Sequence, residues 1–147
     1  MGENILGIAF ECFSGVTLFQ DGKLSLAVNE ERFTRVKLDE TYPINSINWC
    51  LKESGLSPKD IDVICYGFSK GIEQGSFISS MAKRLSEYSN NPKALKIICE
   101  RIGTEAEVDI KRRNNFFRET SKLFQGVPIY SCSHHQSHQS CAYGFAF

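Results

Sequence analysis

The residues with the clearest chemical potential lie near the end of this chain, in the segment SCSHHQSHQSCAY (residues 131–143), which holds all three histidines. His134 and His138 are four positions apart, so a helix places both imidazoles on one face. Ser133 and Gln136 have the spacing of a capping box, which predicts that a helix begins here. The helix N-terminus disfavours an imidazolium, so both rings should stay neutral and able to coordinate a metal. The pair therefore predicts half of a divalent metal site.

Two other interpretations of the histidine pair remain open. Histidines with this spacing also occur on solvated helix faces, although the absence of histidine elsewhere in the chain favours a dedicated role. Alternatively, Cys132, His134, His138 and Cys141 form the pattern C-x-H-x3-H-x2-C, a wholly local zinc site whose spacing matches no common structural zinc motif.

Composition restricts the class of protein. The 147 residues suit one domain or a fragment of one, and 41% of them are hydrophobic, enough for a core. Lys and Arg balance Asp and Glu at 17 each, so nothing global indicates a nucleic-acid partner. No apolar run approaches the roughly 20 residues of a membrane span, and the N-terminus lacks a signal-type pattern. We therefore expect a cytoplasmic protein.

The six cysteines form no CxxC pair, and we expect them to be reduced thiols. Cys50 and Cys65 lie within apolar segments and are predicted to be small core residues. The chain ends on the apolar run AYGFAF without a helix cap or polar tail. This ending indicates the front piece of a longer protein.

Hydrophobic patterning predicts five strands. Three come first, at residues 4–10, 16–19 and 23–28, with an Asp21-Gly22 hairpin joining the second to the third. In the third strand, Leu24, Leu26 and Val28 are expected on one face. Two more apolar runs, at 61–66 and 127–130, predict the fourth and fifth strands.

Helices are predicted between these strands. Pro43 opens one that Gly55 ends, after a charge-rich loop over residues 29–42. Residues 72–125 are expected to be a mostly helical insert, broken at 90–92 and at Gly103. Its basic stretch Lys111, Arg112, Arg113, Arg118 and Lys122 could touch phosphates, but interleaved Phe116 and Phe117 favour a solvated helix with an aromatic packing edge.

The order β-β-β-α-β-(helical insert)-β-α predicts an α/β fold with a mixed five-stranded sheet. This is the layout of a ribonuclease-H-like lobe of the actin, sugar-kinase and heat-shock-protein-70 superfamily. Sites in such sheets lie at strand ends. The turn at residues 12–15 and the start of the histidine helix are therefore expected to converge. Residues 1–147 would form one such lobe, with the insert at about 72–125.

Two motifs carry a resemblance to a known family. The stretch from Asp21 to Leu56, with Glu30-Glu31-Arg32-Phe33-Thr34-Arg35, Lys37 and the helix from Pro43 to Leu51, resembles the N-terminal domain of the O-carbamoyltransferases of nodulation-factor and antibiotic biosynthesis. The ending HHQSHQSCAY is similar to that family's HH-x-x-H-x-x-SA-[FY] segment. The related tRNA-threonylcarbamoyladenosine proteins share the fold and the H-x-x-x-H motif.

The resemblance implies a chemistry and its partners. His134 and His138 would bind a divalent metal, most often iron, with zinc or magnesium as other options, together with an Asp from a C-terminal lobe that lies beyond residue 147. A separate YrdC-like domain would make carbamoyl adenylate from carbamoyl phosphate and ATP. The present kind of domain would then transfer the carbamoyl group to a hydroxyl of a sugar or natural product. An exposed half-lobe surface favours self-association, so a homodimer is one option.

Within that scheme, individual residues receive roles. Arg32 and Lys37 are suited to carbamoyl or phosphate oxygens, as is Arg35 beside the nucleotide. Glu31, or its neighbour Glu30, is placed to orient an acceptor hydroxyl or to act as a base. Ser14 and Gly15 are expected to face the nucleotide or carbamoyl group.

The chain also departs from the family pattern. Glu11-Cys12-Phe13-Ser14-Gly15 stands where the family has an H-D-x-S-A type segment, so the usual first-loop histidine is missing. Two rivals follow: a non-catalytic or nucleotide-binding module of the same superfold, and a sugar-kinase-like phosphotransferase. The fragment alone is expected to be inactive because it lacks the second lobe.

Overall fold

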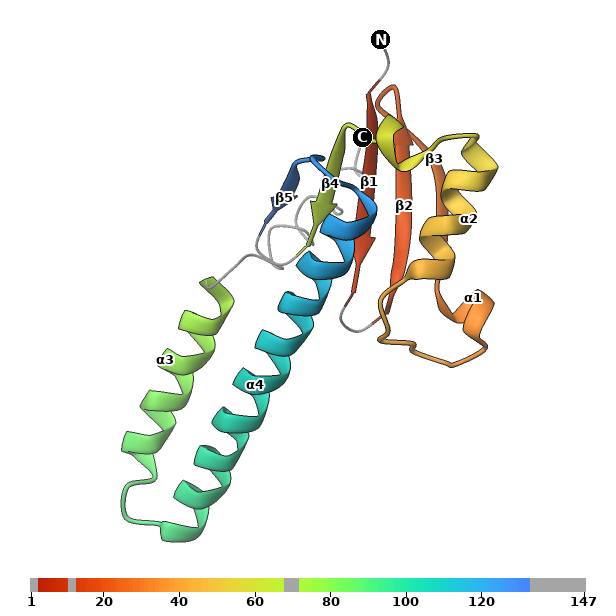
Figure 1. The fold of residues 1–147 in the computed structure, drawn as a ribbon. Helices are drawn as coiled ribbons and strands as arrows, with labels where there is room; N and C mark the ends of the chain where they lie inside the picture. Colours follow the sequence, from red (N-terminus) through yellow and green to blue (C-terminus); the bar gives the residue numbers. More distant parts are fainter. Residues whose placement is uncertain (1–2, 11–12, 68–71, 133–147) are drawn as a thin grey trace.

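A computed structural model of the chain describes residues 3–10, 13–67 and 72–132, excepting the side chains of 72–78, 105, 106 and 109. Five strands form one sheet in the order β3-β2-β1-β4-β5 (Figure 1). The strands are β1 (Asn4–Ala9), β2 (Gly15–Gln20), β3 (Lys23–Asn29), β4 (Val63–Tyr66) and β5 (Ile129–Ser131). β1, β2 and β3 pair antiparallel, whereas β4 is parallel to β1 and β5 is parallel to β4. The predicted mixed five-stranded sheet is confirmed.

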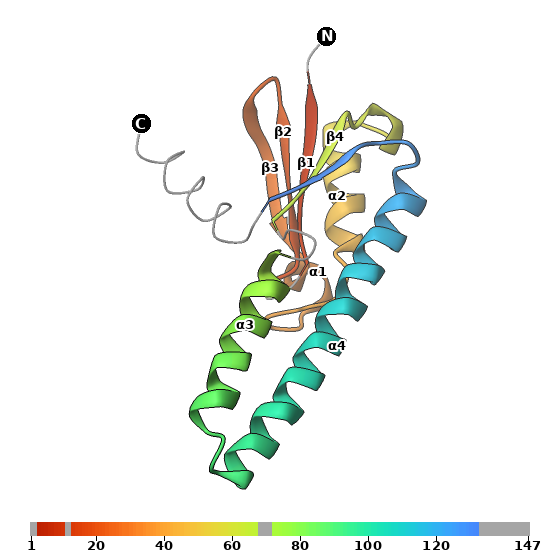
Figure 2. The same cartoon turned by 90° about the vertical axis from the view of Figure 1, so that its left-hand side faces the viewer.

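The helices follow the predicted order. They are α1 (Glu31–Thr34), α2 (Ile44–Ser54), the short 3-10 helix η1 (Pro58–Asp60), α3 (Ile72–Glu87) and α4 (Pro92–Leu123). Asn91 caps α4, because its side-chain oxygen accepts a hydrogen bond from the Ala94 backbone nitrogen at 3.1 Å. α3 and α4 form a hairpin that extends beyond the sheet, as the turned view in Figure 2 also shows. In the described residues, no helix is both long and apolar enough to cross a membrane.

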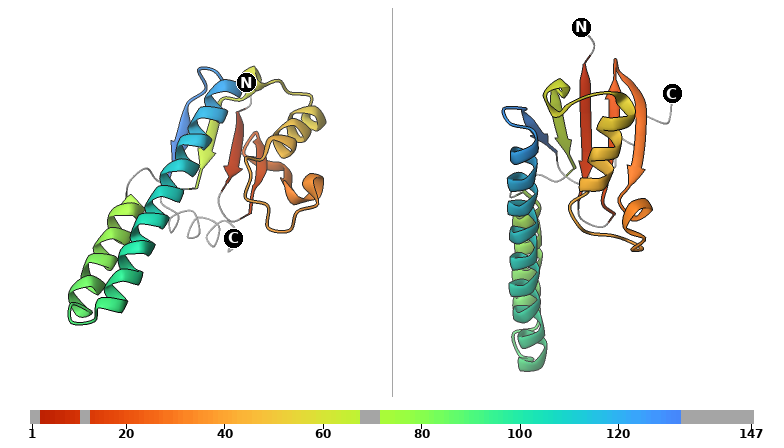
Figure 3. Two further views of the ribbon diagram at one scale, coloured as in Figure 1. Left: turned by 60° about the horizontal axis from the view of Figure 1, so that its bottom comes forward. Right: turned by 45° about the vertical axis from the view of Figure 1, so that its right-hand side comes forward.

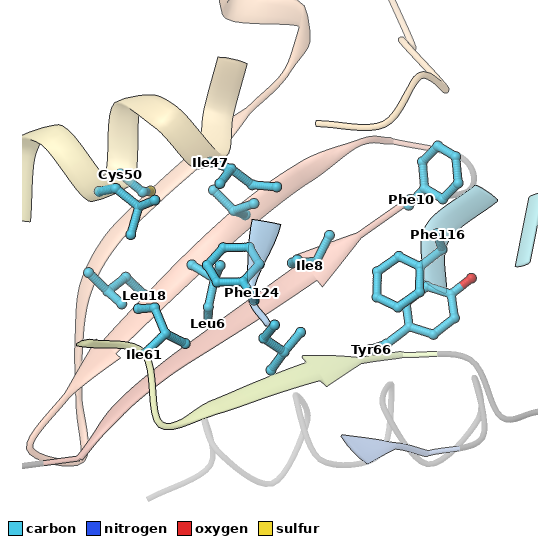
Figure 4. Close-up of a cluster of buried hydrophobic side chains, with 13 residues drawn as sticks. Leu6, Ile8, Phe10, Leu18, Ile47, Cys50, Ile61, Tyr66, Phe116 and Phe124 are labelled. Carbon is cyan, nitrogen blue, oxygen red and sulfur yellow. The ribbon is translucent and has the colours of Figure 1, made fainter. Parts of the chain in front are cut away.

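α2 and the C-terminal part of α4 cover the same face of the sheet (Figure 3). Alternate residues of each strand point into this layer, as the two-residue strand period requires. Figure 4 shows the resulting core. It contains Leu6, Ile8, Phe10, Val16, Leu18, Ile47, Cys50, Leu51, Ile61, Ile64, Tyr66, Phe116 and Phe124.

Aromatic rings join α4 to the sheet. The Phe116 ring stacks on the Tyr66 ring with centroids 3.9 Å apart and planes 14° apart, and Phe116 is fully buried. Arg113 of the basic stretch is buried as well, and Arg112 pairs with Glu40 of the charge-rich loop. This supports the interpretation of the basic stretch as a helix with an aromatic packing edge.

Three local predictions are wrong. Gly103 does not break the insert, because α4 continues through it on an exposed face. Cys65 is exposed, since it alternates with buried Ile64 and Tyr66 and so points to the other side of the sheet. Leu24 does not share a face with the inward residues of β3. A register shift pairs it with Phe19, and it is 55% exposed.

Candidate functional site

The carboxyl ends of three parallel strands meet the first loop at one edge of the sheet. Ala9 at the end of β1 pairs with Gly15 at the start of β2, and Ile8 pairs with Tyr66 at the end of β4. Tyr66 in turn pairs with Ser131 at the end of β5. This is the edge at which α/β sheets of this kind place their ligands. The charge-rich loop begins beside it, because Gly15 also pairs with Asn29.

Ser14 connects the first loop to both ends of the charge-rich loop. Its backbone nitrogen donates a hydrogen bond to the Asp39 carbonyl oxygen at 2.9 Å. Its own carbonyl oxygen accepts one from the Glu30 nitrogen at 2.8 Å. Ser14 is only 2% exposed, yet its hydroxyl oxygen has no hydrogen-bond partner among the described residues. A buried hydroxyl without a partner is costly, so this atom is suited to a ligand.

Gly15 cannot carry a side chain at this position. A Cβ atom there would lie 2.7 Å from the Val28 carbonyl oxygen and 2.8 Å from the Asn29 side-chain oxygen. The contact with the Val28 backbone cannot relax without moving β3. Glycine therefore lets β2 and β3 pair closely beside Ser14.

Glu30 is a structural residue rather than a base. It is 1% exposed and its carboxylate accepts four hydrogen bonds from the start of α2. The donors are the backbone nitrogens and the side chains of Asn45 and Ser46, at 2.7–3.1 Å. Pro43 at the N-cap makes no side-chain hydrogen bond, so Glu30 supplies the cap from a distance. The alternative role of Glu30 as a base is therefore wrong.

Asp39 fixes the other end of the charge-rich loop, and the sequence interpretation assigned it no role. It is 5% exposed, and its carboxylate accepts hydrogen bonds from the Thr34 hydroxyl at 2.6 Å and from the Thr41 nitrogen and hydroxyl at 2.7 and 2.6 Å. These bonds, with that of Thr34 the largest influence, hold the pKa of Asp39 below its usual value. The signal available in the sequence was Asp-x-Thr, which favours an Asx turn.

The predicted catalytic and nucleotide-binding side chains divide between two surfaces. Glu31 borders a small cleft with Ser14 and Asp39, and its carboxylate accepts a hydrogen bond of 3.3 Å from the Leu38 nitrogen. Arg32 instead lines a larger groove, together with Gly15. Both surfaces begin at the same strand ends, so they are neighbouring parts of one site.

The other cations of the loop are exposed. Arg35 ends α1 in the left-handed conformation, at φ 60°, and Lys37 follows it by two positions. Arg32, Arg35 and Lys37 make no ion pair with any described residue, unlike Arg112 or Lys122 of α4. Their charges are therefore available to an anion.

The groove follows the face of the sheet opposite α2 and α4 and has a volume of about 1010 Å³. Its floor is formed mainly by the outward positions of the strands, including Gly7, Thr17 and Cys65. Cys132, the last described residue, lies at its far end. β2 and β5 are separated by β1 and β4, so Gly15 and Cys132 are about 14 Å apart at the usual strand spacing.

The predicted metal ligands His134 and His138 lie outside the described residues, as does Cys12. Cys132, two residues before His134 in the sequence, lies at the carboxyl end of β4. Its backbone nitrogen donates a hydrogen bond of 3.2 Å to the Tyr66 carbonyl oxygen, at the same edge as Ser14. Within the described part of the chain, no three His, Cys, Asp or Glu residues gather as a metal cluster.

Comparison with solved structures supports the fold. A crystal structure from Pseudomonas aeruginosa, described as an uncharacterised protein with similarity to peptidase YEAZ, matches with a TM-score of 0.50 and 12% identity. The match covers 98% of this chain and 49% of that one. At this identity the likeness concerns the fold alone, which is the ribonuclease-H-like arrangement expected from the element order.

Sequence comparison identifies relatives. An uncharacterised Synechocystis protein, sll1178, is 31% identical over 95% of this chain, which spans 23% of the relative. Nodulation protein NolNO of Sinorhizobium fredii is 37% identical over 46% of this chain and 9% of its own length. The chain thus spans less than a quarter of either relative. The family model described as carbamoyltransferase N-terminus matches residues 4–146, and the chain therefore belongs to the carbamoyltransferase N-terminus family.

Proposed function

We propose that this chain is the first lobe of a carbamoyltransferase that moves a carbamoyl group from carbamoyl adenylate to a hydroxyl of a sugar or natural product. Family membership supports carbamoyl transfer in general. The observation that carries the assignment to this site is the buried Ser14 hydroxyl, unpartnered among the described residues, in the small cleft that shares Asn29 with the groove lined by Arg32.

Each group in the site has a role that its surroundings support. Arg32 binds phosphate or carbamoyl oxygens, because a guanidinium can donate two parallel hydrogen bonds to them. The Ser14 hydroxyl, in the neighbouring cleft, donates to the part of the ligand that enters there and gains the partner that it lacks. Gly15 lets β3 pair closely with β2 and so holds the start of the charge-rich loop beside the groove. Arg35 and Lys37 add positive charge at the mouth of the site.

Glu31 is the remaining candidate for an acid or base. It is half-buried and its single described hydrogen bond, from the Leu38 nitrogen, leaves carboxylate lone pairs for an acceptor hydroxyl. Glu31 thus orients the acceptor or removes its proton as the oxygen attacks the carbamoyl carbon. The bond to the adenylate phosphate breaks, and AMP leaves with the phosphate oxygens held by Arg32.

His134 and His138 would hold a divalent metal ion, iron in the first place, because two neutral imidazoles one helical turn apart suit such an ion. A bound metal supplies a Lewis acid that polarises the carbamoyl carbonyl or holds phosphate oxygens. The chain contributes only part of the ligand set, and a C-terminal lobe completes it. Carbamoyl phosphate and ATP enter through a YrdC-like domain that makes the adenylate.

The test is a transfer assay on the complete protein, supplied with a panel of sugars and other hydroxylated acceptors. One reaction contains ATP and isotopically labelled carbamoyl phosphate, and a parallel reaction contains ATP labelled on its terminal phosphate. Label from carbamoyl phosphate in an acceptor supports the proposal. Label from ATP alone identifies a phosphotransferase, and nucleotide binding without either transfer identifies a non-catalytic module.

A further inference from the structure

The groove contains two thiols, one in β4 and one directly after the end of β5. Cys65 lies in β4, where it pairs with Tyr130 of β5. Cys132 follows Tyr130 by two positions, and residues two apart in a strand point to the same face. Both cysteines are free, exposed and part of the groove lining. The hydrogen bond from the Cys132 nitrogen to Tyr66 continues the pairing of the strands and fixes this register.

The strand next to Cys65 on its other side places no side chain over its sulfur. On the β1 side, the residue that pairs with Cys65 is Gly7, which contributes no side chain to the groove. Burial, the largest cause, raises the pKa of the Cys65 thiol, and its interactions with Cys132 and Glu3 act in the same direction. The Glu3 carboxylate favours a cation as the ligand.

Strand geometry decides between a disulfide and a bound ion. Neighbouring strands are about 4.8 Å apart and the chain rises about 3.3 Å per residue, so a diagonal pair has Cα atoms about 8 Å apart. A disulfide needs Cα atoms within about 7 Å and would require the backbone to move. A metal ion between the sulfurs adds about 2.3 Å on each side, which spans the gap.

We propose that Cys65 and Cys132 form a two-thiolate site for one soft metal ion, with Cu⁺ as the best match. Thiolates select soft ions, whereas the imidazole pair of the proposed catalytic site suits borderline divalent ions. Binding converts each thiol to a thiolate, so two protons are released and no electron is transferred. This two-thiolate site has a function separate from carbamoyl transfer. It would sense or store a thiophilic ion next to the proposed transfer site.

The test is an anaerobic titration of the full chain with Cu⁺ in competition with a chromogenic Cu⁺ chelator. The variants are Cys65→Ser and Cys132→Ser. Cys99→Ser is the matched control, because Cys99 is also an exposed thiol but lies on α4. We expect one tightly bound equivalent in the wild type and in Cys99→Ser, and affinity lower by about 100-fold in either groove variant.

Two further variants separate this site from the others that share Cys132. Cys141→Ser and the double variant His134→Ala/His138→Ala should bind Cu⁺ as the wild type does. Wild-type affinity in Cys65→Ser would overturn the proposal. Equal loss in Cys141→Ser or in the histidine double variant would also overturn it, because the ion would then belong to the local segment and not to β4.

Discussion

Glu30 accepts two hydrogen bonds from Ser46, at 2.8 Å from its backbone nitrogen and 2.7 Å from its hydroxyl, although the residues are 16 positions apart. The contact joins the end of β3 to the start of α2 and thereby closes the charge-rich loop. Ser46 is fully buried, so no water can replace the carboxylate. Glu30, which caps the N-terminus of α2, therefore also fixes the position of the loop that carries Arg32.

Replacing Glu30 with Ala should destabilise the protein by about 2–4 kcal/mol, because it removes the cap of α2 and leaves buried donors unpaired. Urea unfolding followed by circular dichroism measures this change. Glu31→Ala is the matched control, since Glu31 has one long hydrogen bond, and it should cost less than about 0.5 kcal/mol. Equal stability of the two variants would contradict the capping role.

Asp39 should make stability depend on acid pH. Its pKa in the folded protein lies below the ordinary value of 3.8, so its contribution is complete above that value. As the pH falls through the lowered pKa, the carboxylate must be protonated and the bonds from Thr34 and Thr41 are lost. The free energy of unfolding, measured from pH 7 to pH 2.5, should fall less steeply below about pH 4 in Asp39→Asn than in the wild type. Identical slopes would exclude Asp39 as the source.

Two glycines should respond in opposite directions to alanine. Gly103 lies within α4, and a methyl group added there would meet no atom within 4 Å beyond the backbone of its own helix. Gly103→Ala should therefore stabilise the protein by about 0.5–1 kcal/mol. Gly15→Ala should destabilise it by about 2 kcal/mol or more, because the methyl group meets the Val28 carbonyl oxygen. Thermal unfolding of both variants measures these shifts, and a destabilised Gly103→Ala would indicate that α4 is interrupted after all.

The metal content of histidine variants should distinguish the predicted ligands from His135. In the complete protein, His134→Ala and His138→Ala should each lose stoichiometric divalent metal by elemental analysis. His135→Ala is the control, because on a helix its ring is rotated by about 100° from that of His134. Unchanged metal in both ligand variants, or an equal loss in the control, would contradict the assignment.

Much of the fold was predictable because strand alternation, the Asp21-Gly22 hairpin and the Pro43 and Gly55 helix boundaries are local signals. The errors have physical causes. A short apolar run does not reveal which face each residue takes, which is why Cys65 was misplaced. Glycine in an exposed helix costs little enough that α4 passes through Gly103.

The site was less predictable than the fold. The rule for such sheets correctly placed the first loop, with Ser14 and Gly15, at the carboxyl ends of the parallel strands. The roles of these residues and of Arg32 stay predictions. Glu30 and Glu31 are adjacent and chemically identical, so the sequence could not show that one caps α2 while the other faces a cleft. That distinction depends on Asn45 and Ser46, which become neighbours only when the loop folds.

The most direct test of the proposed function is kcat/KM for carbamoyl transfer by the complete protein carrying Arg32→Ala. Lys96→Ala is the control, because Lys96 is an exposed cation of α4, in an ion pair with Glu100. We predict that Arg32→Ala lowers kcat/KM by about 100-fold or more with unchanged stability, and that Lys96→Ala leaves it unaltered. Wild-type kcat/KM in Arg32→Ala would contradict the placement of the carbamoyl donor at this end of the groove.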